Sequence, residues 1–457
     1  MKQLRNIVFC CGLLAGCAVS APQQNAKLVC PPQDFGGAPN DDRADTGAIQ
    51  SAIDACEARG GVVALSPGLW LTGGLRLGSD MTFRLEEGAV LQLIPDMALY
   101  PQINPPGGRV ERYAALYAPS AHELTIEGPG RIDGAGPAFW DENFYELGIP
   151  RPTLPRPAPV IALAGCADVV VADLTMENLP GYAISFDYCD SGAVYDVTVR
   201  NDLRSPNTDG VQIRNSRNIV IKRADIETGD DAIVLKSNGR AVENVLVEDS
   251  RLVSDDGALK FGTGSRYGVK NSTFRNNKIL NSRYGVAIFA IDGGVHENNL
   301  FENIVIETGG RHRRTYPVFV DVDRREADRA WGGVDGLVFR NIDITTGGAS
   351  LIAGNPKGVL RNLTLDRISV VRSEAVENLA QSGRKPRGNV TIVAQPDSLD
   401  YAREEADIVV AHARNVILND LSLPACRVDI PREGVKLIDA DIVSGNWNRD
   451  AATCSPP

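Results

Sequence analysis

The stretches RNIVIKRADIET (residues 217–228) and ENVLVEDSRLVS (residues 243–254) share one pattern: an asparagine, a short run of alternating apolar residues, and a second short apolar run. The pattern recurs from residue 120 onward. Its copies align on four asparagines at intervals of 26, 27 and 27 residues: Asn218, Asn244, Asn271 and Asn298. This constant spacing indicates a repeat architecture with a period in the twenties.

Each repeat is too short to bury its own apolar face, and each offers short β-branched strands between Asn, Asp and Gly turns. Stacking the repeats as parallel coils buries that face, with strands roughly 4.8 Å apart along the axis. The sequence therefore predicts an all-β fold, a parallel β-helix. A β-sandwich or a propeller is less favoured, because neither requires so constant a period without hairpin dipeptides.

A different pattern precedes the repeats. Residues 45–61, DTGAIQSAIDACEARGG, place Ile49, Ile53 and Cys56 on one helical face and end in a pair of glycines. We expect a helix that caps the open end of the coil stack, since exposed strand edges invite association. The proline-rich stretch 146–159 should be a loop, and residues 372–407 resemble an insertion; either could wall a cleft.

Composition excludes some functions. The chain has 457 residues, 45 glycines, 27 prolines and a net charge of −11. The glycines and prolines indicate frequent turns. The acidic balance, without a basic stripe, argues against binding to nucleic acid.

The N-terminus resembles a targeting segment. Lys2 and Arg5 precede a short apolar run, Ile7 to Ala15, that is too short to span a membrane as a helix. At the end of this run, Leu14-Ala15-Gly16-Cys17 resembles a bacterial lipoprotein cleavage site. We therefore expect a signal peptide over residues 1–17, a lipid anchor on Cys17, and one β-helix catalytic domain over residues 18–457, displayed in the periplasm or at the outer membrane. The alternative is an ordinary secretory signal.

Six cysteines remain beyond the signal: Cys30, Cys56, Cys166, Cys189, Cys426 and Cys454. An even number in an exported protein is typical of disulfide bonds, and six cysteines allow fifteen pairings. Cys166 and Cys189 lie about one coil apart, so neighbouring coils would bring them together. Buried free thiols are the alternative.

Three acids interrupt the strand pattern: Asp209, Asp230 and Asp231. Asp209 and Asp230 are 21 residues apart and should occupy matching places on adjacent coils. Asp231 can share their face if the strand ends or bulges there, which Gly229 permits. Mutual repulsion would raise at least one carboxyl pKa and so keep an acid protonated, as glycoside hydrolysis requires. Ordinary turn aspartates are the alternative.

The motifs NTDGVQI (207–213) and TGDDAIVLKS (228–237) resemble the acidic signatures of the polygalacturonases, glycoside hydrolase family 28. Residues 34–92 are similar to the N-terminal segment of that family, and GRIDGAGPAFW (130–140) is similar to an early coil. The resemblance runs from about residue 30 to at least residue 345.

This resemblance implies a single-stranded right-handed parallel β-helix that cleaves α-glycosidic bonds of pectin-type polysaccharides or oligosaccharides with inversion. By motif, Asp230 would be the general acid, and Asp209 and Asp231 would hold and activate the water. Asn207 would support the site through hydrogen bonds. No cofactor is implied, and we expect a monomer.

The chain departs from the family where polygalacturonases carry Gly-His-Gly and Arg-Ile-Lys. Gly257 stands where the histidine would be, and Ala287 and Phe289 stand where the basic pair would be. Alanine and phenylalanine cannot bind a carboxylate as arginine and lysine do. Plain homogalacturonan is thus disfavoured, and family members that act on rhamnose-containing or decorated pectins also lack that histidine. Phe289 would suit an apolar sugar face.

Other cations are candidate substrate ligands, above all Lys236, Lys260 and Arg266; each could equally be a solvated surface charge. Asp255 and Asp256 should tune charge or turn geometry. The four histidines, His122, His296, His312 and His412, show no metal-binding spacing, and we predict no metal site.

Two other functions remain open. A lyase on the same architecture would hold calcium with its aspartates and release unsaturated products. A non-catalytic glycan-binding solenoid would keep the acids only as turn residues.

Overall fold

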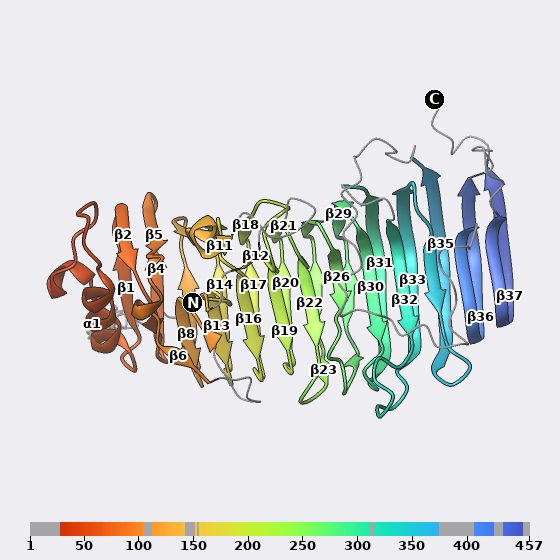
Figure 1. The fold of residues 1–457 in the computed structure, drawn as a ribbon, viewed down its shortest axis with the longest axis horizontal. Coiled ribbons are helices and arrows are strands. Elements are labelled where there is room, and N and C mark those ends of the chain that lie inside the picture. The colour runs from red at the N-terminus through yellow and green to blue at the C-terminus, as the bar shows by residue number, and fades with distance from the viewer. Residues whose placement is uncertain are drawn as a thin grey trace, which may run out of the picture.

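The computed structural model describes residues 28–104, 112–141, 151–152, 155–310, 315–373, 406–424 and 433–450. These residues form one right-handed parallel β-helix with a single row of coils, as predicted (Figure 1). In the described part, 33 strands join one continuous sheet. This sheet winds around the core as three faces, which we name A, B and C.

Face A carries the residues of interest. Its strands pair in parallel from coil to coil, and they are β3 Leu75–Arg76, β8 Leu116–Pro119, β13 Ile161–Ala164, β16 Ile184–Asp187, β19 Val211–Arg214, β22 Ile233–Lys236, β26 Gly257–Phe261, β30 Tyr284–Ala290, β32 Tyr316–Val322 and β34 Ser350–Ala353.

Faces B and C complete each coil. Face B comprises β1 Gly61–Leu65, β4 Met81–Leu85, β9 Leu124–Glu127, β14 Val169–Ala172, β17 Gly192–Tyr195, β20 Ile219–Lys222, β24 Leu246–Glu248 and β28 Thr273–Arg275, with the short β23 Val242–Glu243 and β27 Val269–Lys270 beside it. Face C comprises β2 Gly68–Thr72, β5 Ala89–Leu93, β10 Arg131–Asp133, β15 Thr175–Glu177, β18 Thr198–Arg200, β21 Asp225–Thr228, β25 Arg251–Ser254 and β29 Lys278–Ser282.

Strands become longer toward the C-terminus. Three of them run through faces B and C without a break, β31 Val295–Thr308, β33 Gly333–Thr346 and β35 Val359–Arg372. Two more pass along all three faces, β36 Ala406–Pro424 and β37 Glu433–Asp450.

The remaining elements are small. Two antiparallel pairs project from the coils, β6 Gln102–Ile103 with β7 Arg112–Tyr113, and β11 Trp140–Asp141 with β12 Arg151–Pro152. Three short 3₁₀ helices are η1 Pro32–Phe35, η2 Met97–Leu99 and η3 Gly136–Phe139. In the described ranges, no helix has both the length and the apolar character to cross a membrane.

The core is a continuous apolar column inside the coils. On face A, Val211 and Ile213 point inward while Gln212 and Arg214 point outward, which follows from the two-residue period of a strand. On face B the rings of Phe274, Phe301 and Phe339 stack in successive coils, with centroids 4.6 and 5.0 Å apart.

Helix α1, Thr46–Cys56, covers the first coil as expected (Figure 1). Its buried face includes Ile49, Ile53 and Cys56. The helix ends at Cys56, several residues before the predicted stop at the two glycines. A side chain at Gly61 would approach the Cys56 sulfur to 2.4 Å, so the chain must pass closely over the helix end.

Two disulfide bonds are present in the described part. Cys166–Cys189 joins adjacent coils, which confirms that prediction, and Cys30–Cys56 ties the segment before the helix to its last residue. Cys426 and Cys454, like Cys17 and the signal segment, lie outside the described residues, as do His312 and most of the insertion at 372–407.

The repeated asparagines form ladders at the turns. Asn244 donates to Asn218 at 3.0 Å, Asn303 donates to Asn276 at 3.2 Å, and Asn341 donates to Asn303 at 2.8 Å. These asparagines have positive φ, between 54° and 56°. Asparagine tolerates this left-handed conformation better than other non-glycine residues. The first two of these pairs are 26 and 27 residues apart, the period detected in the sequence, whereas Asn341 and Asn303 are 38 residues apart.

We expect Asn303→Ala to destabilise the coil stack by about 2 kcal/mol, because it loses the ladder bonds and strains a left-handed residue. Asn303→Gly keeps the backbone conformation and should cost about half as much. Thermal unfolding followed by circular dichroism would measure both. Equal losses in the two variants would contradict the assigned role of the backbone conformation.

Candidate active site

The three acids lie at the start of adjacent face A strands. Asp209 lies two residues before the start of β19, and Asp230 and Asp231 lie in the turn between β21 and β22. The pairing of Val211 with Ile233 sets a coil offset of 22 residues. Asp231 is therefore the register partner of Asp209, and Asp230, which we expected in that place, comes one residue earlier.

The turn that carries the acid pair is tightly held. Strand β21 ends at Thr228, whose hydroxyl donates to the Asp230 carbonyl at 2.8 Å, and Ser254 donates to the same carbonyl at 2.7 Å. A side chain at Gly229 would approach the Ser205 carbonyl oxygen to 2.2 Å. Glycine is thus required for the chain to break the strand here and bring both acids to one site.

The three acids are buried and do not form the exposed surface patch typical of turn aspartates. Asp209, Asp230 and Asp231 are 2%, 6% and 3% exposed. Burial, helped by the negative charge of Asp230, raises the pKa of Asp209 to about 6. Burial also raises the pKa of Asp231. Asp209 and Asp231 therefore keep a proton to higher pH than exposed aspartates do.

Asp209 and Asp230 have polar partners that orient them. Gln212 donates to Asp209 at 2.7 Å, and the Lys236 ammonium lies 3.9 Å from the same carboxylate. Asn207 donates to Asp230 at 2.9 Å. The Asn207 amide oxygen in turn lies 3.5 Å from Arg156, which reaches in from the proline-rich loop.

Asp231 belongs to a second set of contacts with Lys260 and Asp256. The Lys260 ammonium lies 2.7 Å from a carboxylate oxygen of each acid. Burial alone would lower the pKa of Lys260, but the two flanking carboxylates raise it above its usual range. Arg283 donates to the other oxygen of Asp256 at 3.2 Å. Asp256 is thus part of the acid cluster.

The remaining predicted substrate ligands differ in exposure. Phe289 is 6% exposed and packs against Tyr284 and Phe319 on the outer side of face A, with ring centroids 6.2 and 5.3 Å away. Arg266 is exposed in the turn after β26. The structure therefore brings Asn207, Lys236 and Lys260 to the acids, and places Arg266 at the far end of the strand.

Sequence reasoning missed two polar neighbours of the acids, Arg156 and Gln212. Gln212 could have been found, since it lies on the outward side of the strand that follows Asp209. Arg156 could not, because its loop has no repeat pattern that would place it.

Carboxylate oxygens of Asp230, Asp231 and Asp256 lie within 4.8 Å of one another, close enough to consider a cation. The Lys260 ammonium already contacts two of the three, so we do not assign them to a metal. Of the described histidines, His296 is buried inside the coils, where burial lowers its pKa to about 4, and His122 and His412 lie near Asp80 and Asp439.

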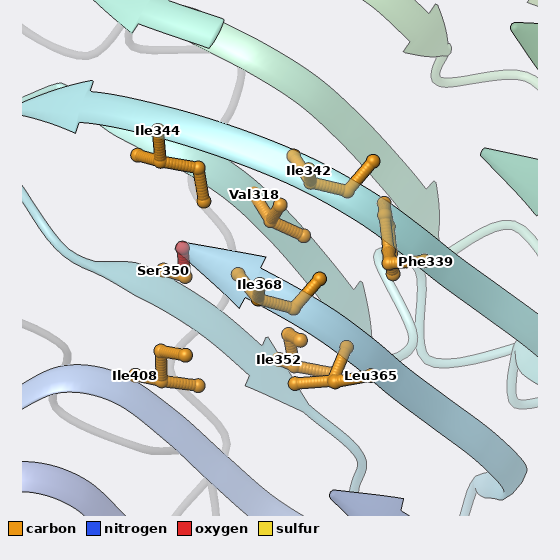
Figure 2. A pocket seen from close by; sticks show the side chains of 9 residues that line it. All are labelled: Val318, Phe339, Ile342, Ile344, Ser350, Ile352, Leu365, Ile368 and Ile408. Atoms are coloured by element: carbon orange, nitrogen blue, oxygen red, sulfur yellow. The ribbon is translucent and has the colours of Figure 1, made fainter. Parts of the chain in front are cut away.

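An apolar pocket lies elsewhere, inside the last coils (Figure 2). Its lining side chains point toward one another from strands β32 to β36, and they are Val318, Phe339, Ile342, Ile344, Ser350, Ile352, Leu365, Ile368 and Ile408. All are buried, and eight of the nine are apolar. It is a packing gap of the core, separate from the acid cluster.

Paired carboxyl groups on one face of a protein are the arrangement that glycoside hydrolases use. Comparison with known proteins identifies the family. The profile of the Glycosyl hydrolases family 28 matches residues 112–378. The chain belongs to this family.

Individual polygalacturonases are also similar to this chain in sequence. A probable polygalacturonase of Vitis vinifera is 29% identical over 295 residues, covering 59% of this chain and 58% of the relative. An endo-polygalacturonase of Pectobacterium parmentieri is 24% identical over 332 residues, covering 68% and 80%. The chain thus spans less than two thirds of the grape protein.

A solved structure shows the same fold. The family 28 exopolygalacturonase of Yersinia enterocolitica superposes with a TM-score of 0.63 at 18% identity, covering 92% of this chain and 79% of that one.

We expect Asp209→Asn to raise the thermal unfolding midpoint more at pH 7.5 than at pH 4. The folded-state pKa of about 6 lies above the unfolded value of roughly 3.9. The native state therefore loses stability as the pH rises between these values, on the order of 3 kcal/mol in total, and the amide removes that loss.

Glu248→Gln is the matched control of opposite sign. Lys222 and then Arg275 lower the pKa of Glu248, so its charge stabilises the fold above the unfolded pKa and that contribution is lost only as the pH falls through the lowered value. This variant should lower the midpoint at pH 7.5. If Asp209→Asn also lowered it, the assigned burial cost would be wrong.

Proposed function

We propose that the protein hydrolyses α-glycosidic bonds of pectin-type polysaccharide or oligosaccharide by single displacement, with inversion at the anomeric carbon. Asp230 would donate a proton to the leaving oxygen. Asp209 and Asp231 would bind and activate the attacking water, and Asn207 would orient Asp230. No cofactor takes part in this scheme.

The observation that carries the proposal is the convergence of these three acids at buried positions on one face of the coils. Inverting hydrolysis needs one protonated and one ionised carboxyl group with room for water between them. Burial and mutual repulsion separate the affinities of neighbouring acids for protons. Membership of family 28 and the match of both acidic motifs support the same roles.

We further propose that plain homogalacturonan is not the preferred substrate. Gly257, Ala287 and Phe289 replace the groups with which polygalacturonases bind a galacturonate carboxylate. The Lys260 ammonium is already engaged by two protein carboxylates. A rhamnose-containing or otherwise decorated backbone, with fewer carboxylates at this subsite, suits such a cleft better.

Two other functions serve as outcomes of the test. A calcium-dependent lyase is less favoured, because an ammonium rather than an open position lies between Asp231 and Asp256. A non-catalytic glycan-binding solenoid would show binding without turnover.

Asp230→Asn should lower the hydrolysis rate roughly 10²- to 10⁴-fold, since it removes the proton donor. The soluble protein from residue 18 onward would be incubated with polygalacturonate, rhamnogalacturonan and rhamnose-capped oligosaccharides. Reducing ends, ultraviolet-absorbing products and the anomer formed first, by NMR, would be read together.

Each result has a definite meaning. New reducing ends of inverted configuration, lost in the variant, support the hydrolase. Unsaturated products that disappear with chelator identify a lyase. Binding without products, unchanged in Asp230→Asn, identifies a glycan-binding protein.

We also propose that residues 1–17 direct export and that Cys17 carries a lipid anchor, so that a monomeric catalytic domain, residues 18–457, is held in the periplasm or at the outer membrane. Cells fed labelled palmitate should label the full-length protein and not Cys17→Ala, which should move to the soluble fraction. Label retained in that variant would contradict the anchor.

A further inference from the structure

The three departures from the polygalacturonase motifs surround one side chain. Lys260 lies on strand β26, next to Gly257 in the same strand and opposite Ala287 in the next coil. Its ammonium lies 5.5 Å from the centre of the Phe289 ring. Residues that are scattered along the sequence therefore border a single position in space.

The position of the Lys260 side chain depends on the absence of a side chain at Gly257. A Cβ atom at position 257 would lie 2.9 Å from Cδ of Lys260 and 3.3 Å from a carboxylate oxygen of Asp231. The Gly257 amide also donates to that oxygen at 3.3 Å. A side chain at position 257 therefore requires Lys260 to move from the place in which it reaches Asp231.

The next coil leaves room for the same lysine. Ala287 is the register partner of Lys260 and is fully buried beside it. A long basic side chain there would compete for the space and repel the ammonium. The electron-rich face of an aromatic ring, as at Phe289, is in contrast favourable near a cation.

The ammonium of Lys260 already has partners within the protein. Its side chain is 13% exposed, and its ammonium contacts both Asp231 and Asp256 at 2.7 Å. Two of its three donors are thus used, and little surface is left to bind a sugar.

We propose that Lys260 is a positioning residue, the internal counter-cation of the acid cluster, which holds Asp231 in place and favours its ionised form. Gly257, Ala287 and Phe289 form the space that it needs. The proposal rests on the proposed function for its catalytic consequence, and it replaces the expectation that Lys260 binds substrate.

The charges around Asp231 explain how Lys260 favours its ionised form. The cluster places four carboxylates in a buried region, and Lys260 opposes the rise that burial causes in the pKa of Asp231. The charged or titratable groups that face this pair from the neighbouring strands are Asp209, Asp230, Lys236, Asp256, Arg283 and Tyr284. Removing the ammonium leaves Asp231 among anions, whereas removing Asp256 leaves the ammonium to Asp231 alone.

We expect removal of Lys260 and removal of Asp256 to shift the pH profile of kcat/KM in opposite directions. Lys260→Met should move the acid limb of kcat/KM about one unit to higher pH and lower kcat at pH 5 about tenfold, with KM within about twofold. Asp256→Asn should move that limb to lower pH. Gly257→Ala should displace Lys260 and shift the limb in the direction of Lys260→Met, while Lys260→Arg should restore part of the loss.

A measurement without substrate accompanies the kinetics. The thermal midpoint of Lys260→Met should fall more at pH 7.5 than at pH 4, because its carboxylates take up protons at low pH and no longer need the ammonium. Lys270→Met removes a half-exposed ion pair with Glu297 on another face and should show a much smaller pH dependence.

The outcomes are distinguishable. A raised KM with an unmoved profile in Lys260→Met would make Lys260 a substrate ligand and overturn the proposal. Shifts of the same sign in Lys260→Met and Asp256→Asn, or equal thermal losses at both pH values, would also overturn it. If the parent protein cleaves nothing, the proposed hydrolysis fails, and the thermal series still decides whether Lys260 is the counter-cation.

Discussion

Parallel backbone pairing between successive coils is the constraint on which the rest of the structure depends. It fixes the offset of 22 residues between β19 and β22, and hence the register of Asp209 with Asp231. The same pairing places Gly257 and Tyr284 in the following coils of that column. A shift by one residue would turn these side chains to the opposite face and dismantle the acid cluster together with the core.

Burial of like charges is the second constraint, and it acts against stability. Four carboxylates lie at buried or half-buried positions, so each needs a donor or a cation. Asn207, Gln212 and Lys260 supply these, and Asn207 and Lys260 each reach an acid on a neighbouring coil. The site is consequently a property of the stack and does not belong to any single repeat.

The departures from the polygalacturonase pattern have one spatial explanation. In the sequence, Gly257, Ala287 and Phe289 mark only the loss of a histidine and a basic pair. In the structure they border Lys260, whose positive charge faces inward to the acids and away from solvent. A change that indicates lost function in the sequence thus corresponds to a redistribution of charge within the site.

The sequence by itself determined the repeat, the solenoid, the capping helix, the Cys166–Cys189 pair and the identity of the three acids, because each follows from local spacing or from motifs. Only the tertiary structure decided that the acids are buried, that Asp231 is the register partner of Asp209, and that Asp256, Arg156 and Arg283 join the site. The physical reason is that burial, register and ion pairing depend on distances between coils. A single sequence gives the approximate length of a coil, whereas a shift of one residue or a few ångströms changes which charges meet.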